Sequence, residues 1–447
     1  MDRRRFIGTL ATAVVGGLAG CGGPGQADKA APPGADDQAG WVYRHDYERL
    51  PAVTSPGTAG GSRLYLAGRR YGADPSTVTA VDATDGTERW RSGVDIPVDW
   101  AAPDADGVSV AFDTRTDDYA EGTVPQLGRL AADGTVVWTG TGEGLDPDPR
   151  ASFGTAGSAT VVSNGQTVAV YDGATGQRRW REPARAVAGT AAATVYTVGD
   201  AGAGTDGAER LLARNAADGT LRWAQEFARV RGTVVGTDRV YVLETVDDRR
   251  VLHGLARSDG QRRWRADLGV DSYVGGAGLV GLDGGVLFAG TPIAAYSADG
   301  DELGRVPDPP GVSGPGGYIR ARTTRQYVFL TAGQAGVPEA VVALDRGSYT
   351  VAWTRSTAGR LFDSADGVCY VLTDQRPLDG SEADGDRRTE RRVLALDGRD
   401  GGRTVWDHWV VGTPVGFDEG DIYTELAATE TALGGVYAYT RDRRQTR

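Results

Sequence analysis

The stretch VDATDGTERW, residues 81–90, places an Asp-Gly pair four residues before a tryptophan. Glycine adopts a positive φ without steric cost, and a neighbouring Asp or Thr side chain can bond to the backbone of the same turn. The stretch therefore predicts a tight turn between two strands, with Trp90 on the second strand. Taken alone, one copy would also suit a binding site.

The same pattern recurs along the chain. Eight related turn glycines follow one another at intervals of 48, 42, 43, 41, 40, 47 and 54 residues, and seven of the copies carry a tryptophan after the turn. A period in the forties is typical of a propeller or a solenoid. The predicted turn and wedge positions are Gly86, Trp90, Gly134, Trp138, Gly176, Trp180, Gly219, Trp223, Gly260, Trp264, Gly347, Trp353, Gly401 and Trp406.

Each period also contains strand-like segments, such as 63–67 and 239–243. Four short antiparallel strands in roughly 40 to 45 residues make one propeller blade. The fold prediction is an all-β protein, a β-propeller of four-stranded antiparallel blades. Residues 40–43 resemble a fourth strand without a blade, and residues 421–424 and 435–439 resemble strands that lack a fourth. Pairing the N-terminal with the C-terminal strands would close the ring without an exposed edge.

The motif Ala80-x-Asp82-x-x-Asp85-Gly86-x-x-x-Trp90 resembles the repeat of pyrroloquinoline-quinone-type (PQQ-like) β-propellers. The resemblance covers about residues 41–440. It implies eight blades, our preferred number. The direct count of eight units plus one split unit leaves nine open.

Three copies depart from the motif. Gly304 stands where the sixth copy should have its tryptophan, the seventh copy has a longer turn, and the eighth has an additional Gly402. Because a missing wedge leaves two blades less firmly packed, the sector near residues 270–305 is expected to be the looser part of the ring.

The first 20 residues are typical of an export signal. Arg3 and Arg4 begin a pattern that resembles a twin-arginine signal, and the apolar run at 7–20 is too short to span a membrane. The run ends at Cys21 in a sequence that resembles a lipoprotein lipobox. Cys21 is therefore predicted to carry a lipid; an ordinary buried cysteine that happens to follow small residues is the alternative.

Residues 21–40 are rich in Gly, Pro, Ala and Asp, and they predict a disordered tether before a single propeller domain at 41–447. Together these segments predict a protein that is anchored by lipid in the cell membrane and faces the extracellular side. The body is expected to be monomeric.

The charge is unusual, with 48 basic and 60 acidic residues, a net charge of -12, and Lys29 as the only lysine. An acidic, lysine-poor chain suggests a halophilic source, and a halophilic archaeon is our expectation; an acidic protein from a low-salt organism is the alternative. Negative charge argues against nucleic acid as a partner.

No local pattern predicts a catalytic or metal site. Residues 202–207 match G-x-G-x-x-G, but a strand rather than a helix is expected after them. The acidic segment 379–390 fails the calcium-loop spacing because Asp384 occupies the position that needs glycine. The three histidines show no zinc-ligand spacing: His45, His253 and His408.

The family resemblance raises the alternative of a quinoprotein dehydrogenase that uses pyrroloquinoline quinone. Such enzymes hold the quinone with an adjacent cysteine pair and bind calcium through Glu and Asn. Here the only two cysteines are Cys21 and Cys369, and the only asparagines are Asn164 and Asn215. We therefore expect no cofactor and no catalysis, although the dehydrogenase remains the alternative.

The preferred function is a non-catalytic module that binds or scaffolds protein or small-molecule partners at the cell surface. In plan the chain resembles the BamB-like lipoprotein propellers of the bacterial outer-membrane assembly machinery. Partners are expected at the longest loops, near 112–126, 199–209 and 374–391.

Overall fold

The computed structural model describes residues 39–440, except 46, 54–62, 71–75, 97, 99, 105, 113–125, 142–151, 201–206, 271–278, 284–285, 290–293, 306–316, 335–336, 358, 366, 378–388, 419–420 and 427–433. The predicted export signal, Cys21 and nearly all of the predicted tether lie outside the described residues. Within the described part of the chain, no helix is long and apolar enough to cross a membrane.

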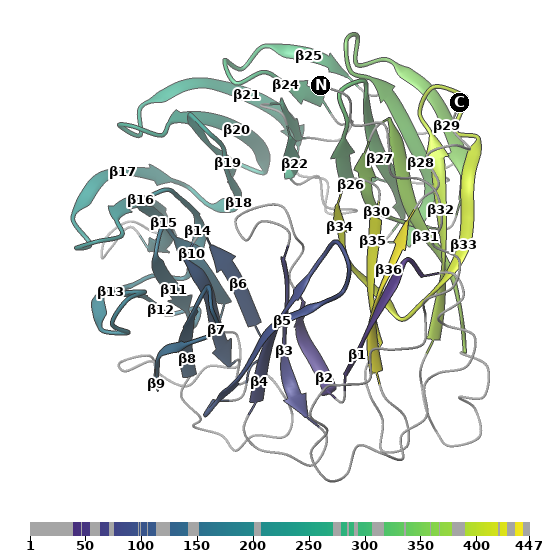
Figure 1. Ribbon diagram of the computed structural model, residues 1–447. Helices are drawn as coiled ribbons and strands as arrows, with labels where there is room; N and C mark the ends of the chain where they lie inside the picture. The colour runs from purple at the N-terminus through teal and green to yellow at the C-terminus, as the bar shows by residue number, and fades with distance from the viewer. Residues whose placement is uncertain are drawn as a thin grey trace, which may run out of the picture.

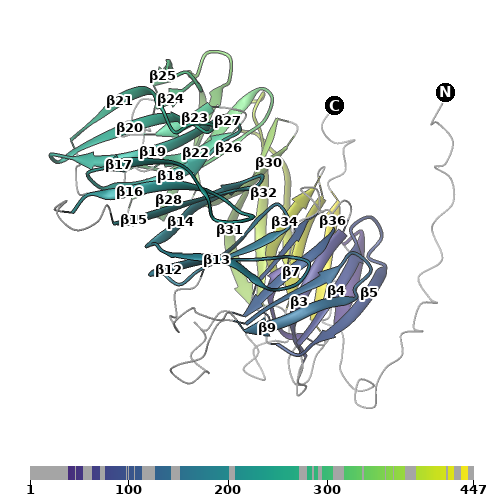
Figure 2. The ribbon, with the colours of Figure 1, turned by 90° about the vertical axis from the view of Figure 1, so that its left-hand side faces the viewer.

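The described residues form 36 strands in nine four-stranded antiparallel sheets, and the sheets are the blades of a ring (Figure 1). The prediction of an all-β propeller is confirmed. In side view, successive blades lie with their sheet faces against one another (Figure 2).

Blades 1 to 4 each consist of four consecutive strands. Blade 1 contains β2 (Tyr47–Val53), β3 (Arg63–Arg70), β4 (Ser76–Asp82) and β5 (Glu88–Val94). Blade 2 contains β6 (Trp100–Asp104), β7 (Gly107–Phe112), β8 (Gln126–Ala131) and β9 (Val136–Thr141). Blade 3 contains β10 (Ser152–Ala156), β11 (Ala159–Ser163), β12 (Thr167–Tyr171) and β13 (Arg178–Pro183). Blade 4 contains β14 (Ala186–Ala191), β15 (Thr194–Asp200), β16 (Glu209–Asn215) and β17 (Leu221–Phe227).

Blades 5 to 8 continue in the same order. Blade 5 contains β18 (Val230–Val235), β19 (Arg239–Val246), β20 (Arg249–Ala256) and β21 (Arg262–Val270). Blade 6 contains β22 (Leu279–Asp283), β23 (Val286–Ala289), β24 (Ala294–Tyr296) and β25 (Glu302–Arg305). Blade 7 contains β26 (Gly317–Thr323), β27 (Tyr327–Gln334), β28 (Val337–Asp345) and β29 (Val351–Ser356). Blade 8 contains β30 (Arg360–Ala365), β31 (Val368–Pro377), β32 (Thr389–Asp397) and β33 (Thr404–Val411).

Blade 9 is the split blade, formed by β34 (Thr413–Asp418), β35 (Asp421–Leu426), β36 (Gly434–Thr440) and the N-terminal β1 (Trp41–His45). β1 pairs antiparallel with β36 in a register that sets Trp41 opposite Ala438, and the two lie side by side in Figure 1. The predicted pairing of first with last strand is therefore present. Eight sheets come from the eight motif-bearing units and the ninth from this split unit. The structure therefore has nine sheets, which is the number obtained by counting the units directly, rather than the eight that the resemblance favoured. The difference arises because the split unit completes a sheet of its own.

The first strand of each blade lies innermost in the ring. Contacts between neighbouring blades run from β6 to β10, β10 to β14, β14 to β18, β18 to β22, β22 to β26 and β26 to β30. The core consists of the layers between sheets: in one cluster, Tyr65 and Val78 of blade 1 pack with Val108 and Val110 of blade 2. Because a middle strand is covered on both faces, all seven residues of β4 are buried.

A β-bulge marks the motif in every one of the eight repeats. The register between the third and fourth strands shifts next to the residue that pairs with the tryptophan position, as at Ala80/Val81 in blade 1 and Ala395/Leu396 in blade 8. A bulge bends the strand and redirects its side chains. The bend therefore lies where the motif side chain leaves its own sheet toward the next blade.

Candidate functional site

The motif tryptophans lie at the junctions between blades. Trp90 in blade 1 donates its indole N–H to the carbonyl of Ala132 in blade 2 at 2.9 Å. A Cβ atom added to Gly134 would lie 2.6 Å from the same indole ring, and Gly134 has a φ of 87°. Only glycine combines that backbone conformation with the space that the ring needs. The motif of blade 1 thus supplies the ring, and the turn of blade 2 supplies the glycine that receives it.

Five further junctions repeat this contact. In each, an indole N–H donates to a carbonyl in the turn of the next blade, and the ring lies against a glycine of that turn. The donor and acceptor pairs are Trp138 to Gly173 (2.8 Å), Trp180 to Ala216 (3.1 Å), Trp223 to Arg257 (2.9 Å), Trp264 to Ala298 (2.9 Å) and Trp353 to Gly398 (2.8 Å).

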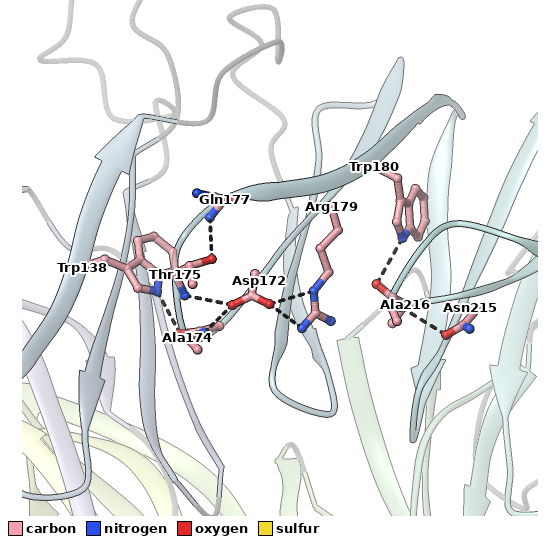
Figure 3. A network of polar contacts seen from close by, with 11 residues as sticks. Trp138, Asp172, Ala174, Thr175, Gln177, Arg179, Trp180, Asn215 and Ala216 are labelled. Atoms are coloured by element: carbon pink, nitrogen blue, oxygen red, sulfur yellow. Dashed lines mark hydrogen bonds and ion pairs between the residues drawn. The ribbon is translucent and has the colours of Figure 1, made fainter.

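The acidic residues of the motif hold the turns. In blade 3, Asp172 accepts backbone N–H groups from Ala174 and Thr175, both at 2.8 Å, as Figure 3 shows. On its other carboxylate oxygen, Asp172 accepts from Arg179 at 3.1 and 2.7 Å. The Arg179 contact, together with these amides, lowers the pKa of Asp172 to about 2, against the opposing effect of burial. This carboxylate is a fixed anion of the turn.

The junction between blades 6 and 7 reverses the motif. Gly304 pairs with Ala295, the position that a tryptophan takes in the neighbouring blades. A Cβ atom added there would lie 2.6 Å from Cβ of Tyr349, which belongs to the turn of blade 7 and is only 8% exposed. The receiving turn therefore supplies the ring, and the donating strand supplies the glycine.

Two predicted turn glycines hold a different place from the one expected. The residue with positive φ in the blade 7 turn is Tyr349, at 55°, rather than Gly347. In blade 8 the ring of Trp353 lies against Gly402, and nothing lies within 4 Å of a Cβ added to Gly401. In these longer turns, the residue at the junction lies one or two positions later in the sequence than predicted. Its place is set by its distance from the fourth strand of its own blade.

Trp406 of blade 8 faces the split blade. Between β36 and β1 there is no connecting turn, because these strands belong to opposite ends of the chain. The ring of Trp406 lies 4.6 Å from that of His408. On the other side of blade 9, the hydroxyl of Tyr43 donates to Glu88 of blade 1 at 2.5 Å, which joins the first and last blades.

An arginine-lined pocket of about 570 Å³ lies at the junction between blades 4 and 5. Its charged lining residues are Arg222 from β17, Asp238 from the connection before β19, Arg239 from the start of β19, Arg257 from the turn after β20, and Arg263 from β21. The hydroxyl residues Thr237 and Ser258 and the small Ala256 complete the lining. Sequence analysis did not identify this pocket.

Two of these arginines are paired with carboxylates. Arg239 donates to Asp299 at 3.1 Å, and Arg263 donates to Asp259 at 3.0 Å. The other two donate to neutral oxygens: Arg222 to the hydroxyl of Thr194 at 2.5 Å, and Arg257 to the carbonyl of Gly236 at 3.3 Å. In the described part of the chain, neither Arg222 nor Arg257 forms an ion pair. Guanidinium groups of this kind are suited to bind phosphate or carboxylate.

The three histidines lie in different blades and do not converge. His45 lies in β1, His253 in β20 and His408 in β33. His253 is 1% exposed and contacts the carboxylate of Glu244 at 2.7 Å. Burial lowers the pKa of His253, although the Glu244 contact opposes the shift, so this is a buried structural pair. Cys369 in β31 is also fully buried, and burial raises the pKa of its thiol.

The other sequence patterns lie mostly in segments between described strands. Residues 202–206 of the G-x-G-x-x-G match and 379–388 of the acidic segment lie outside the described residues. The first pattern connects β15 to β16, so a strand follows it and the dinucleotide-binding arrangement is absent. Among the residues that are described, no group of three His, Cys, Asp or Glu side chains is placed to hold a metal ion.

Comparison with known proteins connects the repeat to a family. The family model described as "Outer membrane protein assembly factor BamB" matches residues 74–243. This range begins in the segment before β4 and ends within β19, so it contains four of the Asp-Gly turns. No curated protein sequence matches the chain significantly.

Several solved structures are similar to this chain. A eukaryotic initiation factor is 10% identical, with 90% of this chain and 92% of that chain covered and a TM-score of 0.56. BamB from Moraxella catarrhalis is 16% identical, with 77% and 94% covered and a TM-score of 0.45. The quinohemoprotein alcohol dehydrogenase ADHIIG from Pseudomonas putida HK5 is 14% identical, with 92% and 77% covered and a TM-score of 0.44. At these identities the similarity concerns the fold.

Proposed function

We propose, from the premise that this chain is a PQQ-like β-propeller, that it works as a non-catalytic module that binds or scaffolds protein partners at the cell surface. The premise rests on the repeat motif and on the BamB family model over residues 74–243. The name of that family describes an assembly factor, and a binding role for this chain agrees with it.

The observation that carries the proposal is how the motif residues are used. Six indole N–H groups donate to carbonyls of the next blade, and the turn carboxylates bond to their own turns, as Trp180 and Asp172 do in Figure 3. These contacts hold the turns and join neighbouring blades, so the residues build the ring. We therefore place the binding function on surfaces outside the repeat motif, such as the loops between strands.

One face of the ring is the natural partner surface. The three long loops predicted to bind partners connect β7 to β8, β15 to β16, and β31 to β32, which are the second and third strands of their blades. In an antiparallel blade, this connection leaves on the opposite side from the Asp-Gly turns, which join the third and fourth strands. All three loops therefore start from one face, and a partner there would leave the turn face free.

The N-terminal segment supplies the location in this proposal. Arg3 and Arg4 would direct export, a lipid on Cys21 would hold the protein in the membrane, and residues 22–40 would give the propeller reach. Replacing Cys21 by serine should move the protein from the membrane fraction to the soluble fraction. Unchanged membrane retention of Cys21→Ser would argue against lipid anchoring.

The binding role is tested by crosslinking the full chain in its own membranes, at the salt concentration of growth, and identifying the captured proteins. A deletion of residues 379–388 from the loop face should remove a specific partner, whereas Arg179→Gln on the turn side of blade 3 should retain it. Capture that does not depend on the loop face would contradict the proposed surface.

A dehydrogenase activity is the competing outcome. Purified protein supplied with pyrroloquinoline quinone and calcium should neither reduce an electron-accepting dye with alcohol or sugar substrates nor gain thermal stability, because a ligand that binds the folded state raises its melting temperature. Quinone-dependent dye reduction would overturn the non-catalytic proposal.

A further inference from the structure

We propose that the arginine-lined pocket between blades 4 and 5 is a binding site for a small molecule that carries a phosphate group. The inference does not depend on the partner proposed above, because the pocket lies on the turn side of the ring. Thr237 and Asp238 connect β18 to β19, and Arg257 and Ser258 connect β20 to β21. In an antiparallel blade both connections leave on the same side.

The repeat provides an internal control for Arg222. In blades 1, 3 and 5 the residue before the motif tryptophan is also arginine, and each of these arginines is ion-paired with an aspartate of its own turn: Arg89 with Asp82, Arg179 with Asp172, and Arg263 with Asp259. In these blades the positive charge is neutralised inside the motif.

Blade 4 differs from blades 1 and 3 at the residue that opens its turn. Asn215 opens its turn, where blades 1 and 3 have aspartate, and it holds the backbone N–H of Ala217 at 3.1 Å as the aspartates hold theirs. Figure 3 shows both residues that open a turn, Asp172 with its contacts to Arg179 in blade 3 and Asn215 in blade 4. A neutral amide can hold the turn but cannot neutralise a guanidinium group. Arg222 instead extends to Thr194 and lines the pocket.

Arg257 is a second departure from the repeat. Its carbonyl accepts the indole N–H of Trp223, a role that alanine or glycine fills at the other five docked junctions. That contact uses only the backbone, so the arginine side chain is not needed for docking. Blade 5 therefore adds a guanidinium group to the same pocket to which blade 4 contributes Arg222.

The charges of these two arginines act on a buried neighbour, Tyr196. It is fully buried, and its ring lies 5.7 Å from that of Trp223. Burial raises the pKa of Tyr196, while the positive charges of Arg257 and Arg222 oppose the rise.

The size and chemistry of the pocket define the ligand class. A volume of about 570 Å³ falls within the range of roughly 300 to 1,000 Å³ that small-molecule sites occupy. Two unpaired guanidinium groups can each make forked hydrogen bonds to phosphate oxygens, and Thr237 and Ser258 add hydroxyl donors. The rest of the ligand would fill the part of the pocket that the phosphate group does not occupy. It could be a soluble phosphorylated compound or the headgroup of an anionic phospholipid.

The test is calorimetric titration of the full chain with inorganic pyrophosphate, at low and at high salt. Arg222→Gln and Arg257→Ala should each weaken binding by about tenfold or more, because each removes a charge-assisted hydrogen bond. Asn215→Asp is the sharper variant: it leaves every lining residue in place, yet it should recapture Arg222 as in blades 1 and 3 and weaken binding. Arg179→Gln is the matched control and should bind like the wild type.

A second arm uses vesicles of phosphatidylglycerol in phosphatidylcholine. Vesicle binding that is lost in Arg257→Ala would identify a lipid headgroup as the source of the phosphate, and pyrophosphate binding without vesicle binding would identify a soluble compound. Circular dichroism melting should show that the variants fold. Absence of pyrophosphate binding, or equal binding by folded wild type, Arg222→Gln and Arg257→Ala, would overturn the proposal.

Discussion

The two junctions on either side of blade 6 are built in opposite ways. On one side, Trp264 of blade 5 reaches forward and donates to Ala298 at 2.9 Å, with its ring against the glycine of that turn. On the other side, blade 6 presents Gly304, and Tyr349 of blade 7 occupies the junction. Each junction combines one large ring with one position that lacks a side chain. A junction therefore needs side-chain atoms that fill a given volume between the two blades, and either blade can supply them.

This comparison changes the expectation for the sector near residues 270–305. The absence of a tryptophan predicted a looser packing, but Tyr349 is buried against Gly304. Placing the ring on the turn of blade 7 has its own cost, because Tyr349 adopts a φ of 55°. This left-handed backbone conformation costs a residue with a side chain roughly 1 to 2 kcal/mol. Reduced stability, if measured at this junction, would reflect backbone strain as well as packing.

Removal of a docked ring should have the largest effect. Trp223 is 6% exposed, so Trp223→Ala should lower the free energy of unfolding by about 3 to 5 kcal/mol. Trp406→Ala is the matched control, because Trp406 has the same place in its motif but faces the split blade. Denaturant titration should show the smaller loss for Trp406→Ala, and equal losses would mean that docking on a turn adds nothing.

Restoring the motif at the reversed junction should have the next largest effect. Gly304→Trp should destabilise the protein by about 1 to 3 kcal/mol, because Tyr349 already fills the space. Adding Tyr349→Gly should recover much of that loss, since the pair would then match a regular junction. Purely additive effects in this double-mutant cycle would show that the two positions are not coupled.

The turn ion pair should produce a smaller, pH-dependent effect. The pKa of Asp172 is about 2, below its ordinary value of 3.8, so the pair with Arg179 stabilises the fold above pH 3.8 and loses this contribution as the pH falls toward 2. The side chains of Arg179 and Asp172 are 24% and 25% exposed, so solvent limits the effect to about 1 kcal/mol or less. The wild type should lose more stability than Asp172→Asn over this range. Parallel pH profiles would contradict the assignment.

The smallest effect is expected for the converse change in blade 4. Asn215→Asp should alter stability at neutral pH by no more than about 0.5 kcal/mol, because it adds one partly exposed ion pair to a turn that is already held. It should nevertheless introduce the acid dependence that Asp172 gives blade 3. A melting temperature that responds to acid as the wild type does would show that Arg222 is not recaptured.

Much of the fold could be predicted from the sequence, because the same pattern of strands, turn glycine and aromatic residue recurs eight times. The repeat identified both residues that meet at a junction, such as Trp90 and Gly134. The sequence alone does not show that Trp90 contacts the turn of the next blade rather than a residue of its own blade. Trp41 and the strands near 421 and 435 predicted the closure of the ring. The longer turns near Gly347 and Gly401 were less predictable, because an inserted residue changes which position meets the ring.

The candidate site was harder to predict because its residues come from two blades. The sequence signal was present at Asn215 and Arg257, each of which departs from its own repeat, but a departure gains meaning only when both side chains are seen to line one pocket. The predicted partner loop near 112–126 lies almost entirely outside the described residues. Deviations from a repeat thus identify candidate sites better than the repeat itself does.

The central claim is that the motif tryptophans dock on the following blade. It is tested most directly by the hydrogen exchange of indole N–H groups, measured by NMR on protein labelled at tryptophan. The six docked indoles, those of Trp90, Trp138, Trp180, Trp223, Trp264 and Trp353, should exchange more slowly than the indole of Trp406, because their N–H groups are held by carbonyls of the next blade. Exchange of the six at the rate of Trp406 would contradict the claim.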